Sequence, residues 1–144
     1  MSALEDRAKL RAQLQRHEGY RRFIYVDTVG KRSIGYGRNL DDVGIREHEA
    51  AYLLSGDITT AIQDLVTRYP WFERIDPVRQ AVLVNMGFNL GATKLAGFKN
   101  TLASIERGQY GDASKRMLDS LWAAQVGQRA VELSAQMRTG AWQA

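Results

Sequence analysis

The chain has 144 residues, the length of one ordinary domain, and its 44% hydrophobic and 25% charged residues exclude collagens, coiled coils and disordered chains. Cysteine, a run of 18 apolar residues and an apolar N-terminal signal segment are all absent, which predicts a soluble protein without disulfides, thiolate metal sites or its own export signal. The net charge of +4 divides into +5 over residues 1–40, −5 over 41–76 and +4 over 77–144, which fits either a mixed-sign solvated surface or a preference for a polyanion.

A helix and then a hairpin are predicted for the first forty residues. Ser2 and Glu5 fit a capping box that opens the helix, and Gly19 is expected to end it. The β-branched and aromatic residues at 22–26 and the segment 31–36 flank a turn at 27–30, which predicts an antiparallel hairpin. Glycines at 35 and 37 indicate close backbone approach or a third, poorly regular strand.

The rest of the chain is predicted to be helical. Apolar spacing over 45–68 indicates a long helix, in which Ser55 and Gly56 mark a break or a weak point. Asp76 and Pro77 begin a helix over 78–90 that is apolar nearly all round and is therefore expected to be buried on every side. Shorter helices are expected over 98–107, 111–124 and 128–138. The predicted class is α+β, with a long central helix between two lobes.

Three polar residues surround the predicted hairpin: Glu18 at the helix end, Asp27 in the turn and Ser33 in the returning strand. Two carboxyl groups across a cleft are what glycoside hydrolysis requires, because one donates a proton to the leaving oxygen and the other activates a water or attacks the sugar. On spacing alone, a solvated acid and a turn-forming aspartate are the simpler interpretation.

The whole segment 17–37 closely resembles the active-site hairpin of the phage-type (T-even phage) lysozymes, glycoside hydrolase family 24. That family's pattern is Glu, eight residues, Asp, five residues, Thr, and then Ile-Gly-x-Gly. The segments 85–91, 95–102 and 138–142 also resemble family segments, in order and at similar distances. The resemblance extends over about residues 10–143.

The resemblance implies a lysozyme-like fold and a muramidase that cleaves the β-1,4 bond between N-acetylmuramic acid and N-acetylglucosamine without a cofactor or metal. Glu18 would be the general acid, while Asp27 and Ser33, which stands where the family has Thr, would hold the attacking water. The implied mechanism is inverting, which requires carboxyl groups about 6.5–9.5 Å apart. Glu18 must keep its proton near neutral pH, which partial burial favours and a nearby cation opposes.

The resemblance also implies residues around this centre. Arg129 is expected to form an ion pair with Glu18. Arg38 is expected to form a salt bridge with Asp57 that ties the hairpin to the central helix, the alternative being two solvated charges. Four further side chains match positions along the saccharide groove: Asn39, Phe88, Thr101 and Arg116. Phe88 also fits a plain core position, and Trp122 and Trp142 match core positions of the family.

The expected organisation is a single lysozyme domain over 1–144, with a small lobe at 18–57, a helical lobe made of 1–17 and 58–144, and a short N-terminal extension at 1–9. We expect a monomer that acts on peptidoglycan, with no nucleic-acid partner and no stable membrane insertion. By family resemblance, it would lyse a bacterial host after waiting in the host cytoplasm until a membrane pore opens a way to the periplasm.

Two other functions are compatible with parts of the sequence. A lytic transglycosylase uses a single acid and forms an anhydro sugar, and the presence of Asp27 and Ser33 argues against it. A catalytically silent basic module that binds cell wall or DNA is disfavoured because both carboxylates are present.

Overall fold

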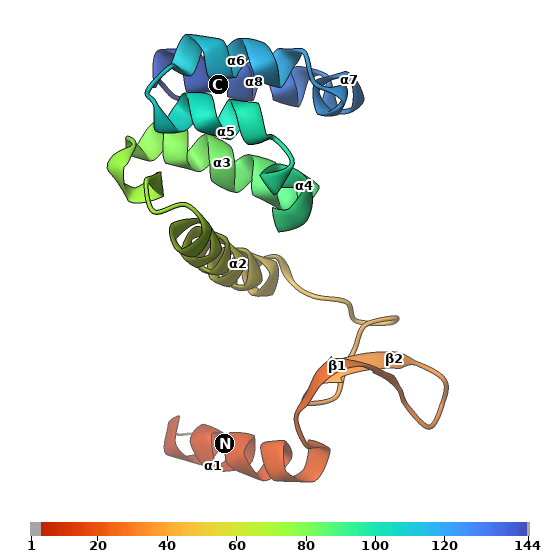
Figure 1. Cartoon of the computed structure of the whole chain (residues 1–144). Coiled ribbons are helices and arrows are strands. Elements are labelled where there is room, and N and C mark those ends of the chain that lie inside the picture. The colour runs from red at the N-terminus through yellow and green to blue at the C-terminus, as the bar shows by residue number, and fades with distance from the viewer. Residues whose placement is uncertain (1–3, 144) are drawn as a thin grey trace. The chain divides into compact units, whose positions relative to one another are not determined.

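The computed structural model describes residues 4–143, which fold into helices and one small three-stranded sheet (Figure 1). The chain divides into two compact units, the N-terminal unit at 1–53 and the C-terminal unit at 54–144. The elements in chain order are α1 (Leu4–Glu18), β1 (Arg21–Val26), β2 (Arg32–Gly35), β3 (Arg38–Asn39), α2 (Glu47–Arg68), the 3-10 helix η1 (Phe72–Arg74), α3 (Pro77–Leu90), α4 (Ala92–Ala96), α5 (Lys99–Glu106), α6 (Tyr110–Leu118), α7 (Leu121–Val126) and α8 (Gln128–Thr139). The predicted α+β, lysozyme-like class is confirmed.

The N-terminal unit consists of α1, the sheet and the first part of α2. Gly19 adopts a φ of 72°, which ends α1 at the predicted place. Strands β1 and β2 pair antiparallel, and β3 adds two residues to the other edge of β2, so both the hairpin and the irregular third strand are confirmed. The predicted capping box depends on Ser2, which lies outside the described residues.

Helix α2 runs without interruption through Ser55 and Gly56. The hydroxyls of Thr59 and Thr60 donate to the carbonyl oxygens of these two residues, at 3.2 Å and 3.1 Å, one turn back along the helix. Gly56 is therefore a tolerated weak point and not a break. Because the boundary between the units falls after Leu53, α2 contributes residues to both.

The C-terminal unit has one core, to which η1 and every helix from α2 to α8 contribute buried side chains. Asp76 begins α3 as predicted, since its Oδ2 accepts a hydrogen bond from the backbone nitrogen of Arg79 at 3.1 Å. The prediction that this helix is buried on every side was wrong. Val82, Leu83 and Met86 form one fully buried face, whereas the other sides stay partly open.

The predicted helix over 111–124 is two helices, α6 and α7. Ser120 separates them, because its hydroxyl donates to the carbonyl of Met117 at 2.7 Å and accepts from the backbone nitrogen of Ala123 at 3.1 Å. One side chain thus ends α6 and begins α7. Trp122 in α7 is buried as expected, but Trp142 is 69% exposed and is not a core residue.

Helix α1 and the sheet belong to the same compact unit, the N-terminal one. The lobe boundaries expected from the sequence, 18–57 against 1–17 and 58–144, stay a prediction. Among the described residues, no helix combines the length and apolarity needed to cross a bilayer.

Candidate active site

Asp27, Ser33 and Asn39 lie on one face of the sheet. Ser33 pairs with Tyr25 on one side and with Asn39 on the other, and directly paired residues of antiparallel strands face the same way. Asp27 follows Tyr25 by two positions and so shares this face. Ser33 is 2% exposed and Asp27 is half-buried, whereas Val26, which points to the other face, is 65% exposed. The structure therefore brings together three of the predicted site residues on one face of the sheet, the face that is less exposed to solvent.

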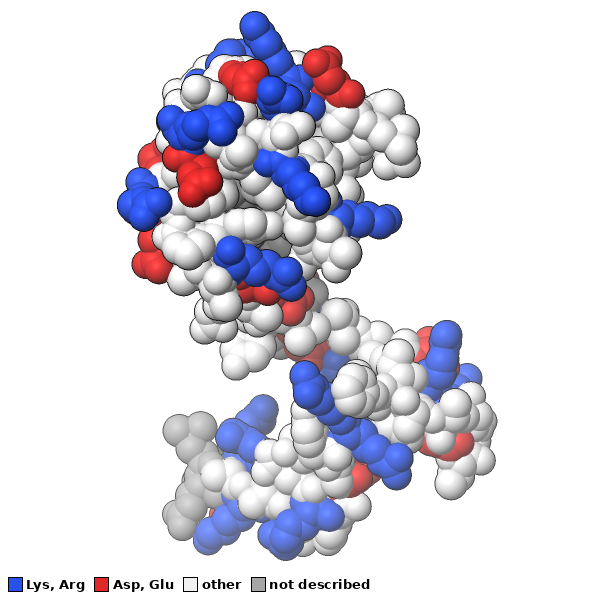
Figure 2. Space-filling view, in the orientation of Figure 1, with Lys and Arg blue, Asp and Glu red and all other residues white. Residues whose placement is uncertain are grey.

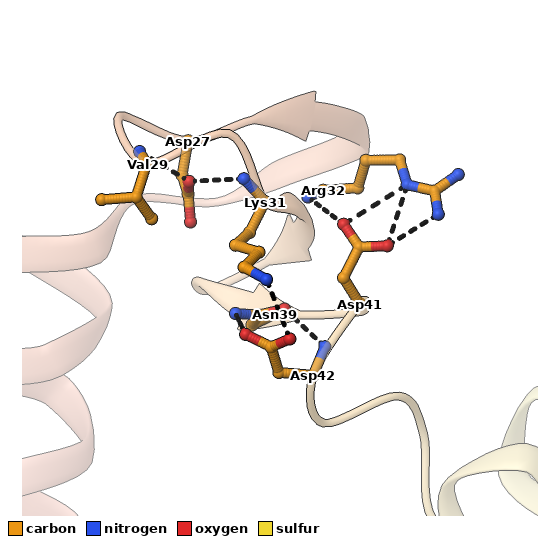
Figure 3. A network of polar contacts seen from close by, with 7 residues as sticks. All are labelled: Asp27, Val29, Lys31, Arg32, Asn39, Asp41 and Asp42. Atoms are coloured by element: carbon orange, nitrogen blue, oxygen red, sulfur yellow. Dashed lines mark hydrogen bonds and ion pairs between the residues drawn. The ribbon is translucent and has the colours of Figure 1, made fainter.

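A turn holds the side chain of Asp27 in place (Figure 3). Its Oδ1 accepts hydrogen bonds from the backbone nitrogens of Val29, at 3.0 Å, and Lys31, at 2.8 Å. The backbone nitrogen of Asp27 in turn donates to the carbonyl of Lys31 at 2.8 Å, which extends the β1–β2 ladder by one rung. These bonds fix one carboxylate oxygen relative to the sheet.

Two aspartates after β3 brace this turn and the start of β2 (Figure 3). The ammonium of Lys31 donates to Asp42 at 3.1 Å, and Asp42 also accepts from the side-chain amide of Asn39 at 3.1 Å. Asp41 accepts from the backbone and the guanidinium of Arg32, at 2.8 Å and 2.6 Å. Hydrogen bonds from Arg32 lower the pKa of Asp41 to about 2. Asn39, predicted to line the saccharide groove, is thus engaged in this network.

Glu18 ends α1, and its carboxylate lies against the turn between β2 and β3. A Cβ placed on Gly37 would stand 2.9 Å from the Oε2 of Glu18, so only glycine leaves room for the carboxylate in this position. The rings of Tyr20 and Tyr36, with centroids 5.7 Å apart, hold the neighbouring backbone segments together. Glu18 is exposed, so the partial burial expected for it is not provided by the N-terminal unit.

The prediction for Arg38 was wrong in its acidic partner, which is Glu49 and not Asp57. Both terminal nitrogens of Arg38 bind the Glu49 carboxylate, Nη1 to Oε1 at 2.7 Å and Nη2 to Oε2. Glu49 stands in the first turn of α2, about 12 Å along the helix from Asp57. The hydrogen bonds from Arg38 lower the pKa of Glu49 to about 2.

The sequence did contain a signal for Glu49. It lies three residues after Arg46, and its Oε1 accepts a hydrogen bond from the backbone nitrogen of Arg46 at 2.8 Å, as the acidic residue of a capping box does. This spacing marks the first turn of α2, which is the turn that follows the sheet most closely in the chain. An acid in that turn was therefore a better candidate partner for Arg38 than an acid two turns later.

A groove of about 840 Å³ in the C-terminal unit contains two of the predicted substrate-binding residues, Thr101 and Arg116. Lys94, Lys99 and Trp122 also line it. Phe88 does not belong to this groove. It is 44% exposed and lines two other, mainly apolar pockets of the same unit, so the alternative of a plain core position does not hold, and its role in binding substrate stays a prediction.

Arg129 joins α8 to α3. Its Nε donates to the side-chain oxygen of Asn85 at 2.9 Å, and its Nη2 donates to the carbonyl of the same residue at 3.2 Å. The expected ion pair between Arg129 and Glu18 would join residues of the two units and stays a prediction.

The family model for phage lysozyme matches residues 15–138. The chain belongs to the phage lysozyme family.

Several named proteins resemble this chain at low sequence identity. The probable T4-type lysozyme 1 of Dictyostelium discoideum is 24% identical and aligns over 92% of this chain and 95% of its own length, and the probable T4-type lysozyme 2 aligns over the same shares at the same identity. The pre-baseplate central spike protein Gp5 of Enterobacteria phage T4 is 26% identical over 88% of this chain, which corresponds to 27% of that longer protein.

Membership of this family makes the protein a glycoside hydrolase that acts on peptidoglycan. Within the described part of the lysozyme, no group of three or more His, Asp or Glu side chains is arranged to bind a metal ion. On the face shown in Figure 2, acidic side chains stand between the basic ones of the C-terminal unit. This distribution favours the mixed-sign surface over a uniform polyanion-binding stripe on that face.

Proposed function

We propose that this protein cleaves the β-1,4 bond between N-acetylmuramic acid and N-acetylglucosamine, with Glu18 as the general acid. The observation that carries the proposal is the common sheet face of Asp27 and Ser33, combined with the contact of Glu18 with the next turn of the same sheet. Glu18 would protonate the oxygen of the leaving sugar, as glycoside hydrolysis requires.

Asp27 and Ser33 are proposed to hold the attacking water. The turn uses Oδ1 of Asp27, and Oδ2 is the oxygen assigned to accept a proton from the water. The hydroxyl of Ser33 both donates and accepts, so it can orient the same water. A water between sugar and carboxylate leads to inversion at the anomeric carbon.

The groove of Thr101 and Arg116 is proposed to bind part of the wall polymer, since it combines cationic, hydroxyl and aromatic groups. Family membership supports a role in the lysis of a bacterial host. For that role we propose a monomer that stays in the host cytoplasm until a membrane pore admits it to the periplasm.

The products of peptidoglycan digestion test the reaction. Mass analysis should find a new reducing end, and proton NMR at early times should find the inverted anomer. Glu18→Gln should abolish the clearing of chloroform-treated Gram-negative cells. An anhydro product would indicate a transglycosylase, and undiminished clearing by the Glu18→Gln variant would contradict the assigned acid.

A further inference from the structure

We propose that Arg38 and Glu49 are positioning residues of the lysozyme reaction, because their ion pair holds the turn at Gly37 against the carboxylate of Glu18. This inference rests on the proposed role of Glu18 as general acid. Neither residue is assigned a contact with the substrate.

The position of the Glu18 carboxylate depends on where the turn lies. A Cβ on Gly37 would lie only 2.9 Å from Oε2 of Glu18, so the backbone of the glycine limits how far the carboxylate can move toward the turn. Arg38 is the next residue in the chain. Any movement of Arg38 is therefore transmitted through one peptide bond to the surface that supports the acid.

The sheet alone holds this turn weakly. Strand β3 consists of two residues. Arg38 and Asn39 pair with Ile34 and Ser33 of β2, and one further hydrogen bond joins the backbone nitrogen of Leu40 to the carbonyl of Arg32 at 2.8 Å. A pairing this short gives little independent stability. The guanidinium of Arg38 supplies the missing restraint, with two hydrogen bonds to Glu49 and a third, at 3.1 Å, to the carbonyl of Gly44.

Glu49 anchors this restraint on a helix. The same carboxylate accepts the backbone N–H of Arg46, so one side chain caps the start of α2 and binds the sheet. Both partners are about 70% covered, with side-chain exposures of 29% for Arg38 and 28% for Glu49. A bidentate ion pair of this kind fixes the orientation of the guanidinium and the carboxylate as well as the distance between them, which a flexible surface pair does not do.

A misplaced acid slows the chemical step more than it weakens substrate binding, because a displacement of about 1 Å can cost a hundredfold in rate. For Glu49→Gln and for Arg38→Gln we therefore expect kcat on purified peptidoglycan to fall about tenfold or more. The half-saturating substrate concentration should stay within twofold. The double variant should lose no more than either single variant, because the two residues act as one unit.

Arg68→Gln is the control, since it breaks an ion pair with Asp64 on α2 and involves no residue of the sheet. Its kcat should stay within twofold of the wild type at a temperature where circular dichroism shows all variants folded. Unchanged kcat in Glu49→Gln, an equal loss in Arg68→Gln, or additive losses in the double variant would each overturn the proposal.

A second measurement separates this proposal from the proposed function. The amide signal of Gly37 in the NMR spectrum should shift in Glu49→Gln and stay in place in Arg68→Gln, whether or not Glu18 is the acid. If Glu18→Gln stays active, the proposed function fails while the amide shift still judges the restraint. If Glu18→Gln is inactive but neither kcat nor the Gly37 signal responds to Glu49→Gln, the restraint alone is refuted.

Discussion

The side-chain oxygen Oδ1 of Asp27 lies 2.8 Å from the backbone nitrogen of Lys31, so the proposed catalytic carboxylate also closes its own turn. Asparagine keeps an oxygen that can accept this bond but loses the charge. We expect Asp27→Asn to fold with a nearly unchanged melting temperature and to lose about a hundredfold or more in kcat, the usual effect of removing an acid–base group. Thermal unfolding and reducing-end release measure the two quantities.

Asp27→Ala is the comparison variant, because it removes both the charge and the oxygen that accepts the hydrogen bonds of the turn. Two hydrogen bonds are lost, at about 1 kcal/mol each, so its free energy of unfolding should fall by about 1–2 kcal/mol. A fully active Asp27→Asn variant would show that the residue serves the turn alone. An Asp27→Asn variant as unstable as Asp27→Ala would show that the amide oxygen does not preserve the turn.

A methyl group on Gly37 should affect activity more than stability. Its φ of +77° costs a non-glycine residue about 1–2 kcal/mol, and the added Cβ meets the Glu18 carboxylate at 2.9 Å. The carboxylate ends a flexible side chain and can move away, so the clash displaces the proposed acid without much further loss of stability. We expect Gly37→Ala to lose at least tenfold in kcat.

Gly35 provides the control for this prediction. It has a φ of +71° and nothing within 4 Å of an added Cβ, so Gly35→Ala carries the same backbone strain without the clash. Urea unfolding should show similar destabilisation of both variants, and kcat should fall only in Gly37→Ala. Equal kcat values in the two would remove the support for a carboxylate held by this turn.

Local patterns predicted the elements more reliably than the contacts between them. Gly19 and Pro77 act on the backbone next to them, and the helix end and helix start followed as expected. The partner of Arg38 depended on how far β3 lies from each turn of α2, which helical spacing alone does not determine. The break at Ser120 was missed because the apolar residues on either side of it, Leu118 and Leu121, keep helical spacing across the break. The active-site pattern was recognisable because Glu18, Asp27 and Ser33 follow the family spacing.

Stability of the N-terminal unit should fall in acid. Hydrogen bonds from Arg32 and Arg38 lower the pKa values of Asp41 and Glu49 to about 2, below their ordinary values of about 4. A lowered pKa in the folded state stabilises the protein above the unfolded pKa, and this contribution disappears as the pH falls through the folded pKa. We therefore expect the loss between about pH 5 and pH 2.

The double variant Asp41→Asn/Glu49→Gln isolates this effect. Its melting temperature should decrease less steeply than that of the wild type from pH 5 to pH 2, and 1 M salt should narrow the difference because both pairs are partly exposed. Parallel curves for the two proteins would mean that these carboxylates do not contribute to the acid sensitivity.

Arg116 should affect substrate binding and not the chemical step. Its guanidinium lines the groove in the C-terminal unit, and its bond to Asp112, at 2.9 Å, is an exposed pair one helical turn apart, which contributes little to stability. Arg116→Gln should raise the half-saturating peptidoglycan concentration about threefold to tenfold and leave kcat within twofold. Arg68→Gln breaks an equivalent exposed pair with Asp64, on a residue that does not line this groove, and should change neither quantity. Identical kinetics of the two variants would exclude a role of Arg116 in holding the wall polymer.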